Sequence, residues 1–203
     1  MITIKGNKRN FLVFIIPILI LIVLTIGLIY TRAPWSDESW LASSAVNLIR
    51  NGFMGNTNII ADGTWLEGIN QYTFWQPPLY FLAEAAFLKV FDVGLFQVRF
   101  LNLFWALISI GAIYYILRKI TNNKIIIFLS LLVLSVDKNF LEASSGGRMD
   151  LMAVSFSLIS YAVYLNIREK NLSMAIFLGN LFVCLSGLTH GNGILGFCGL
   201  LFI

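Results

Sequence analysis

Two adjacent carboxylates, Asp37 and Glu38, are the first residues in the sequence whose types and position suggest chemistry. They follow an uncharged apolar block at residues 11–30, so they lie where a hydrocarbon layer would give way to water. Partial desolvation at such a boundary raises the basicity of a carboxylate toward use as a general base. Acids in the first turn of a helix are also stabilised by the helix dipole, by about 0.3–1 kcal/mol. The sequence alone leaves both interpretations open.

A second charged group, Arg148 and Asp150, lies just before an apolar block that begins near residue 151. Carboxylates and a guanidinium brought to one face of a membrane are what a reaction on a phosphate-bearing lipid needs, although a solvated loop pair has the same residues. Arg99 lies a few residues into another apolar block and is either an interfacial anchor or a phosphate contact. His190 ends a further block and is either a hydrogen-bonded structural residue or a functional one.

Membrane-spanning helices are the elements that must position these residues. The 203 residues are 58% hydrophobic and 12% charged, with a mean hydropathy of +0.82, whereas about a quarter of the residues of a soluble domain are charged. A cleaved signal peptide explains residues 11–30 less well, because no A-x-A-like site follows them. The predicted fold class is all-α, a polytopic transmembrane helical bundle. Its expected spans are residues 11–30, 95–117, 125–141, 151–167 and 172–189, with a partial span at 194–203.

The basic residues between these blocks predict the topology. By the positive-inside rule they are cytoplasmic, and they lie at residues 5–9, 118–124 and 168–170. This arrangement leaves residues 77–91 no room to cross the membrane, and a helix of that length spans only ~22 Å. Because it also carries Glu84 and Lys89, we predict an interfacial helix there. A second interfacial helix is expected at residues 37–51, so the candidate residues share the outer face.

Three other features carry no chemistry in this interpretation. Cys184 and Cys198 lie in apolar blocks and are expected to be small, lipid-buried core residues, not a disulfide or metal framework. Residues 191–196 match the G-x-G-x-x-G string, but no strand precedes them, so the glycines are expected to allow close helix approach. The net charge of +4 reflects topology and predicts no nucleic-acid partner.

Several landmarks occur in order along residues 10–203. Asp37-Glu38 follows a single N-terminal span, and Gln76-Pro77-Pro78-Leu79-Tyr80 is similar to a His-Pro-Pro-Leu-Tyr motif, with glutamine in the place of histidine. Val98 to Leu101 is similar to Val-Arg-Leu, Arg148 to Asp150 to Arg-x-Asp, and Gly187 to His190 to Gly-Leu-Thr-Lys. Together they resemble the GT-C membrane glycosyltransferases, specifically the protein-mannosyltransferase and aminoarabinose-transferase-like branch.

The resemblance implies transfer of a sugar from a polyprenyl-phosphate donor to an acceptor at the outer membrane face, with inversion. Asp37 would act as the general base on the acceptor hydroxyl, with Glu38 as the next candidate. Because some relatives use a divalent metal and others do not, Asp150 would position either a metal or an arginine. The remaining roles implied are donor phosphate binding by Arg99, Arg148 and His190, and a substrate loop of Gln76, Pro77, Pro78 and Tyr80.

The expected partners are the lipid bilayer, the polyprenyl-phosphate sugar and an acceptor that is a protein, a lipid or a glycan. The expected location is the plasma (inner) membrane, with the N-terminus in the cytoplasm. We interpret residues 1–203 as one transmembrane domain and, because the chain stops inside an apolar block, as the N-terminal part of a longer protein. Two alternatives remain, a non-catalytic membrane fragment and a transporter subunit, and the latter predicts charges facing one another inside the spans.

Overall fold

The computed structural model describes residues 8–202, and every regular element among them is helical. In chain order these elements are α1 (Lys8–Thr31), α2 (Ser36–Asn51), α3 (Leu79–Phe91), α4 (Leu95–Ile120), α5 (Lys124–Val136), α6 (Lys138–Ser145), α7 (Asp150–Ile167), α8 (Leu172–Thr189), the 3₁₀ turn η1 (Gly191–Ile194) and α9 (Leu195–Leu201). The predicted all-α fold class is confirmed.

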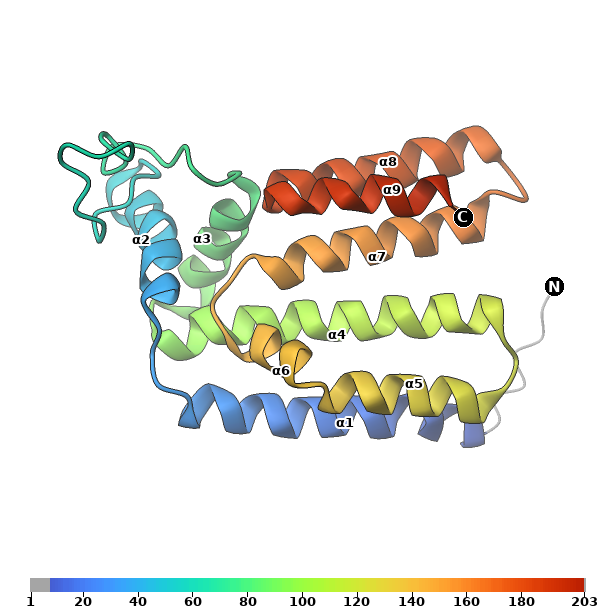
Figure 1. Cartoon of the computed structure of the whole chain (residues 1–203). Helices are drawn as coiled ribbons and strands as arrows, with labels where there is room; N and C mark the ends of the chain where they lie inside the picture. The colour runs from blue at the N-terminus through green and yellow to red at the C-terminus, as the bar shows by residue number, and fades with distance from the viewer. Residues whose placement is uncertain (1–7, 203) are drawn as a thin grey trace.

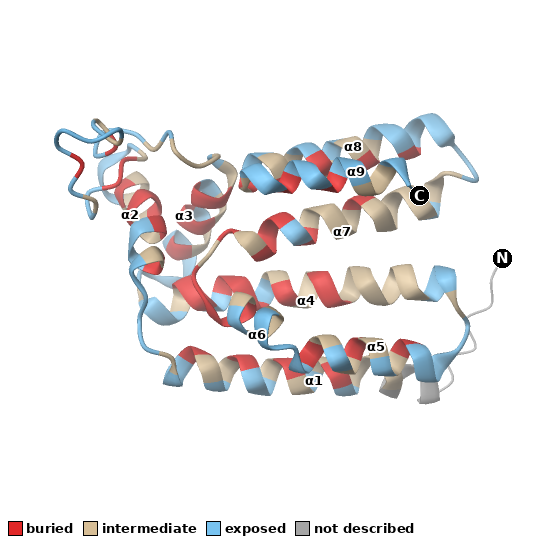
Figure 2. Cartoon of the chain, in the orientation of Figure 1, coloured by how far each residue is buried: buried red, intermediate tan, exposed pale blue. Residues whose placement is uncertain are grey.

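Four helices, α1, α4, α7 and α8, are long and apolar enough to cross a membrane. They overlap four of the ranges in which we expected spans, and they lie side by side with α5 and α9 in one bundle (Figure 1). Their outward faces carry exposed apolar side chains, whereas buried residues lie on the faces turned to neighbouring helices (Figure 2). Exposed apolar helix faces of this kind are typical of a protein surrounded by lipid. The chain is therefore an integral membrane protein.

The two ends of the bundle differ. The basic connections between α4 and α5 and between α7 and α8 lie at one end, while α2, α3 and the segment leading into α7 lie at the other (Figure 1). Part of the expected N-terminal basic segment, including Lys5, lies outside the described residues. The arrangement agrees with a topology in which residues 77–91 do not cross the membrane, and the orientation in the membrane stays a prediction.

Helices α2 and α3 form a small layer across this end of the bundle. α2 ends at Asn51 and is capped by Gly52, whose φ of 75° is the left-handed conformation that favours glycine after a helix end. The two helices pack together through small and aliphatic side chains, including Ala45, Ala85 and Leu88. Glu84, which the sequence placed on an interfacial helix, points inward and is fully buried.

The segment expected as one span at residues 125–141 consists of two helices in the structure. α5 ends at Val136, and Asp137 then starts α6 by accepting a hydrogen bond from the backbone N–H of Phe140 at 2.8 Å. An aspartate in this capping position favours a new helix over the continuation of the old one. α6 packs against α1 and α4, so residues 138–145 contribute to the bundle.

The glycines near the C-terminal end allow helices to approach closely, as the sequence predicts. A Cβ atom added at Gly193 would lie 2.3 Å from the carbonyl oxygen of Ser186, and one at Gly199 would lie 2.1 Å from the hydroxyl of Tyr161. Because real Cβ atoms do not approach other atoms this closely, side chains at these positions would push η1 and α9 away from α7 and α8. Within the G-x-G-x-x-G string, Gly193 is therefore a packing position, as is Gly196, where an added Cβ would lie 2.6 Å from Oγ of Ser157; Gly191 has nothing within 4 Å of an added Cβ.

Candidate active site

Four of the residues singled out in the sequence meet in a line at the α2–α3 end of the bundle. Arg148 Nη1 lies 3.3 Å from Asp37 Oδ2, and Arg148 Nε donates to Asp150 Oδ2 at 2.9 Å. The other oxygen of Asp150 lies 3.8 Å from His190 Nε2. The four side chains come from the start of α2, the segment before α7, the start of α7 and the end of α8. We call this line, Asp37–Arg148–Asp150–His190, the charged line.

The charged line is open to its surroundings. Asp37 is 29% exposed, Arg148 is 37% exposed and Asp150 is 42% exposed. The guanidinium carbon of Arg148 lies 5.2 Å from the ring centroid of Trp35, a cation–π contact that holds it between the two carboxylates. A substrate can contact partly exposed charged groups without breaking a buried ion pair. These side chains are therefore accessible enough for catalysis or binding.

Glu38, the neighbour of Asp37, is in the opposite environment. Its carboxylate and the guanidinium of Arg99 form a bidentate ion pair, with Nε to Oε1 and Nη2 to Oε2 both at 2.8 Å. The two side chains are 4% and 1% exposed. Oε1 also accepts from the N–H of Gly147 at 3.1 Å, and Oε2 from the N–H of Trp35 at 3.0 Å. Each carboxylate oxygen therefore has two donors.

Arg99 is equally well satisfied. Besides Glu38, its guanidinium donates to the carbonyl oxygens of Ile29, Arg32 and Ala33 at 2.8, 3.0 and 3.2 Å. These carbonyls belong to the last turn of α1 and the residues after it, which lack helical partners of their own. All five donors of the guanidinium are used within the chain. The predicted role of Arg99 in phosphate binding is untested, but in this structure no donor remains for a phosphate.

The surroundings of Glu38 also set its protonation. Burial raises the pKa of this carboxyl, but the hydrogen bonds from Arg99 and from the backbone of Trp35 and Gly147, together with the charge of Arg99, outweigh it. The pKa of Glu38 is therefore lower than its usual value, and the group is a carboxylate that binds protons weakly. A general base must instead bind a proton readily, so the pairing with Arg99 favours a positioning role for Glu38.

The segment that carries Arg148 is fixed from two sides. Gly147 donates its N–H to Glu38, and Asn102 on α4 donates its side-chain amide to the carbonyl oxygen of Gly146. A Cβ atom at Gly147 would lie 2.3 Å from Cγ1 of Val98. Only glycine fits this close approach of backbone to α4. The buried pair thus positions the charged line through one backbone bond.

Two cavities meet at Asp150. The first, of about 430 Å³, is lined at its head by Asp150 and His190 and continues between α7 and α9. The second, of about 370 Å³, lies among α1, α6 and the segment before α7, and it is lined by polar groups that include Arg32, Glu142 and Arg148. One cavity is mostly apolar and the other is mixed in character, and both are lined by Asp150.

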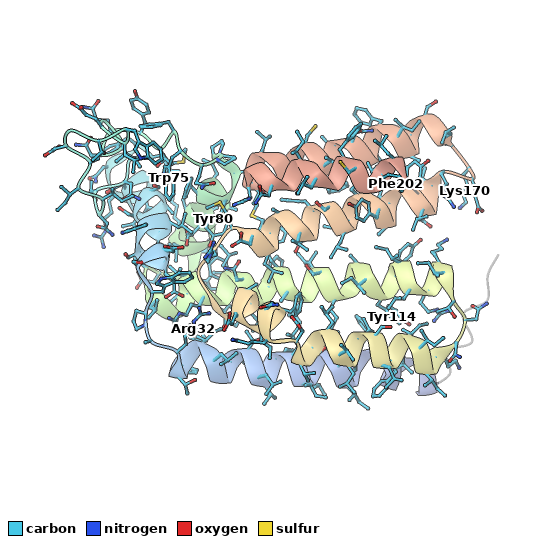
Figure 3. All side chains as sticks on the ribbon, in the orientation of Figure 1. Arg32, Trp75, Tyr80, Tyr114, Lys170 and Phe202 are labelled. Carbon is cyan, nitrogen blue, oxygen red and sulfur yellow. The ribbon has the colours of Figure 1, made fainter. Side chains whose placement is uncertain are left out.

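The predicted substrate loop is placed differently from the charged line. Tyr80 is fully buried on α3 and packs with Phe81, while Pro78 directly precedes the helix. Figure 3 labels Tyr80 at the α2–α3 end of the bundle, and it shares a buried cluster with Met149, which directly precedes α7. Gln76 and Pro77 are partly buried and line neither of these cavities. A substrate role for this loop stays a prediction.

A metal site does not follow from the donor groups present. Among residues 8–202, no group of three or more His, Cys, Asp or Glu side chains could hold a metal ion together. Asp150, the residue expected to position a metal or an arginine, holds Arg148 with one oxygen and faces His190 with the other. Metal dependence stays a prediction.

The structure also brings in residues that the sequence reasoning missed. Asn102 is fully buried and fixes Gly146, while Arg32 and Trp35 line the mixed cavity. Asn102 could have been found from the sequence, because a polar residue one turn after Arg99 in an apolar span is energetically costly unless it has a hydrogen-bond partner. Nothing in the sequence pointed to Arg32 and Trp35, because their place in the cavity lining depends on how α6 folds back onto α1.

The fold and the line of charges at its end define an integral membrane protein whose candidate reaction centre lies where its long helices end. Residues 75–199, more than half of the chain, match the family described as dolichyl-phosphate-mannose-protein mannosyltransferase, and the chain belongs to that family. No curated protein and no solved structure gives a significant match. The protein is thus a membrane glycosyltransferase of the GT-C kind, and the family implies a lipid-linked sugar donor. The matched range includes Arg99, Arg148, Asp150 and His190, but not Asp37 or Glu38.

Proposed function

We propose that the protein transfers a sugar from a polyprenyl-phosphate donor to a hydroxyl group of an acceptor, with inversion at the anomeric carbon. The reaction would take place at the outer face of the plasma (inner) membrane, with the N-terminus in the cytoplasm. The observation that carries the proposal is the charged line, which places a carboxylate and a guanidinium 3.3 Å apart, with an apolar and a mixed cavity meeting at its Asp150.

The donor lipid has a suitable path in the first cavity. Its lining residues on α7 recur at helical spacing and are Asp150, Ala153, Val154, Ser157, Leu158 and Tyr161. This stripe is ~16 Å long at ~1.5 Å per residue, and it runs from the charged line toward the middle of the bundle. An isoprenoid chain could lie along it with its phosphate beside Arg148 and His190. The acceptor would then approach through the second cavity.

Asp37 is the carboxylate best placed to act as the base. Its Oδ2 faces Arg148, and its Oδ1 has no hydrogen bond among residues 8–202. In the proposed step, Asp37 takes the proton of the acceptor hydroxyl while the oxygen attacks the anomeric carbon. The bond from that carbon to the phosphate oxygen breaks, and the lipid phosphate leaves with the electron pair. Arg148 stabilises the charge that develops on this phosphate.

The experiment that tests the proposal compares Asp37→Asn with Asp62→Asn in native membranes supplied with a polyprenyl-phosphate sugar. Asp62 is an exposed acid in the segment between α2 and α3, so its variant controls for loss of charge. We expect Asp37→Asn to lose transfer by about 10²–10⁴-fold, the size of a general-base contribution, while insertion and donor binding persist. Full activity of Asp37→Asn would exclude Asp37 as the base.

A further inference from the structure

Glu84 is a buried carboxyl group that the proposed mechanism does not use. It lies on α3, its side chain is fully buried, and neither of its oxygens has a hydrogen-bond partner among the described residues. Glu38, by contrast, has four donors. A buried carboxylate without partners is very costly, and such a group binds a proton instead.

The charged residues around Glu84 are all accounted for elsewhere. α3 packs against α2, α4 and α8, and α8 carries no charged residue. The charged residues on the other elements are Lys89 on α3, Asp37, Glu38 and Arg50 on α2, and Arg99, Arg118 and Lys119 on α4. Glu38 pairs with Arg99 and Asp37 with Arg148, Lys89 and Arg50 are exposed, and Arg118 and Lys119 lie at the far end of α4.

Burial raises the pKa of Glu84 to about 8, even though the adjacent hydroxyl of Tyr80 lowers it. The carboxyl group is therefore mostly protonated at neutral pH. Burial together with Glu84, and to a smaller extent Asp150 and Glu38, also raises the pKa of Tyr80, so its hydroxyl keeps its proton. Both groups are then hydrogen-bond donors as well as acceptors.

Tyr80 is a neighbour of both Glu84 and Asn102, and Asn102 bonds to the segment that carries Arg148. Both are fully buried, and the Tyr80 hydroxyl lies beside Glu84 and Asn102 but forms no hydrogen bond with either in the described structure. Asn102 Nδ2 donates to the carbonyl oxygen of Gly146, which orients the amide and leaves Oδ1 as a buried acceptor without a donor. The buried oxygens of Glu84, Tyr80 and Asn102 are thus three neighbouring polar groups without hydrogen-bond partners among the described residues.

We propose that un-ionised Glu84 is a positioning residue whose acid proton completes a directed hydrogen-bond chain from Glu84 through Tyr80 and Asn102 to Gly146. In this chain the carboxyl O–H of Glu84 donates to the Tyr80 oxygen, and the Tyr80 O–H donates to Asn102 Oδ1. The last bond, from Asn102 to Gly146, is present in the structure. Gly146 lies two residues before Arg148, so the chain stiffens the segment that carries the guanidinium.

Loss of the Glu84 proton reverses the chain. A carboxylate only accepts hydrogen bonds, so the Tyr80 O–H turns toward Glu84 and Asn102 Oδ1 loses its donor. The amide of Asn102 is then held less firmly, and residues 146–149 open more often. The consequence for sugar transfer rests on the proposed function, because it requires Arg148 to act in catalysis. The effect on the opening of residues 146–149 does not depend on the proposed function.

Amide hydrogen exchange of residues 146–149, measured on the full chain in lipid nanodiscs, tests the proposal. Rates corrected for intrinsic exchange would be compared at pH about 6.5 and about 9.5, on either side of the Glu84 titration. We expect opening in the unaltered protein to increase about fivefold at the higher pH, the effect of losing one neutral hydrogen bond. Glu84→Gln, whose amide donates at every pH, should show no increase, and the exposed control Glu67→Gln should behave as the unaltered protein.

Two further readouts keep the test decisive. Infrared difference spectra of the unaltered protein should show a protonated carboxyl band that disappears between the two pH values, so a failure of Glu84→Gln to fold would not matter. Tyr80→Phe, which lacks the relay hydroxyl, should show the faster opening at both pH values. Absence of the band, or an equal rise in opening in Glu84→Gln, would overturn the inference.

Sugar transfer by Arg148→Ala separates this inference from the proposed function. Normal transfer by that variant, together with a pH-insensitive segment in Glu84→Gln, would remove the proposed function and leave the positioning chain in place. Loss of transfer in Arg148→Ala, together with identical pH profiles of unaltered protein and Glu84→Gln, would do the opposite.

Discussion

Asp37 and Glu38 are neighbours in sequence and the same kind of group, yet the structure gives them contrasting surroundings. Glu38 is buried, has four hydrogen bonds and is paired in bidentate fashion with a buried arginine. Asp37 is 29% exposed and has one contact, to a half-exposed arginine. The difference arises because consecutive residues of a helix point in directions about 100° apart, so Glu38 points to Arg99 on α4 and Asp37 points to the half-exposed Arg148.

The contrast shows how a polar site can be built at the end of a membrane bundle. The Glu38–Arg99 pair connects α2, the end of α1, α4 and the segment before α7, and its groups have no donor left for a substrate. The Glu38–Arg99 pair supports the segment that carries Arg148. The side chains of the charged line are partly exposed, so they can still form hydrogen bonds or ion pairs with a substrate. We interpret the buried pair as the part that fixes geometry and the exposed line as the part that reacts.

The largest expected effect comes from breaking the buried pair. Arg99→Ala leaves Glu38 as an unpaired buried carboxylate and three carbonyls of the α1 end without donors, so we expect a loss of about 3–5 kcal/mol of folding stability. Thermal unfolding in detergent measures it, with Arg50→Ala, an exposed arginine near the end of α2, as the matched control. An unchanged melting temperature would show that the pair does not support the fold.

The same pair sets the acid response. The pKa of Glu38 is lower in the folded state than its usual value near 4.5, so its contribution to stability is present above that pH and is lost as the pH falls through the folded-state pKa. Acid should therefore destabilise the unaltered protein more steeply than Glu38→Gln below pH about 4.5. Parallel curves for the two proteins would contradict the depressed pKa.

A substitution that breaks the charged line should leave the folding stability nearly unchanged and remove sugar transfer. Arg148→Ala removes half-exposed ion pairs worth up to about 1 kcal/mol, but it also removes the donor that would stabilise the leaving phosphate, which is worth about 10²–10³ in rate. Initial rates of sugar transfer and melting temperatures would be measured together. A melting temperature as low as that of Arg99→Ala would show that the two regions do not divide the roles in this way.

The sequence predicted the bundle and the members of the charged line because both depend on local properties. Blocks without charge produce long helices, and Asp37, Arg148, Asp150 and His190 each stand at the end of such a block. Pairing could not be predicted, because it depends on how helices rotate against each other. Glu38 was expected as the next candidate base and Arg99 as an interfacial anchor or a phosphate contact. Their pairing across 61 residues, and the start of a new helix at Asp137, were not expected.

The smallest expected effect tests the connection between the two regions. Gly147→Ala places a Cβ atom 2.3 Å from Cγ1 of Val98, so the segment carrying Arg148 must shift, at a cost of about 1–3 kcal/mol for overpacking. We expect reduced transfer from a protein that still folds, and partial recovery in Gly147→Ala/Val98→Ala, where the obstructing methyl group is gone. Gly111→Ala, with nothing within 4 Å of its added Cβ, is the control and should be neutral. Recovery in the double variant would show that the support acts through the position of the segment, whereas equal loss in both variants would mean that Gly147 matters for a reason other than its approach to α4.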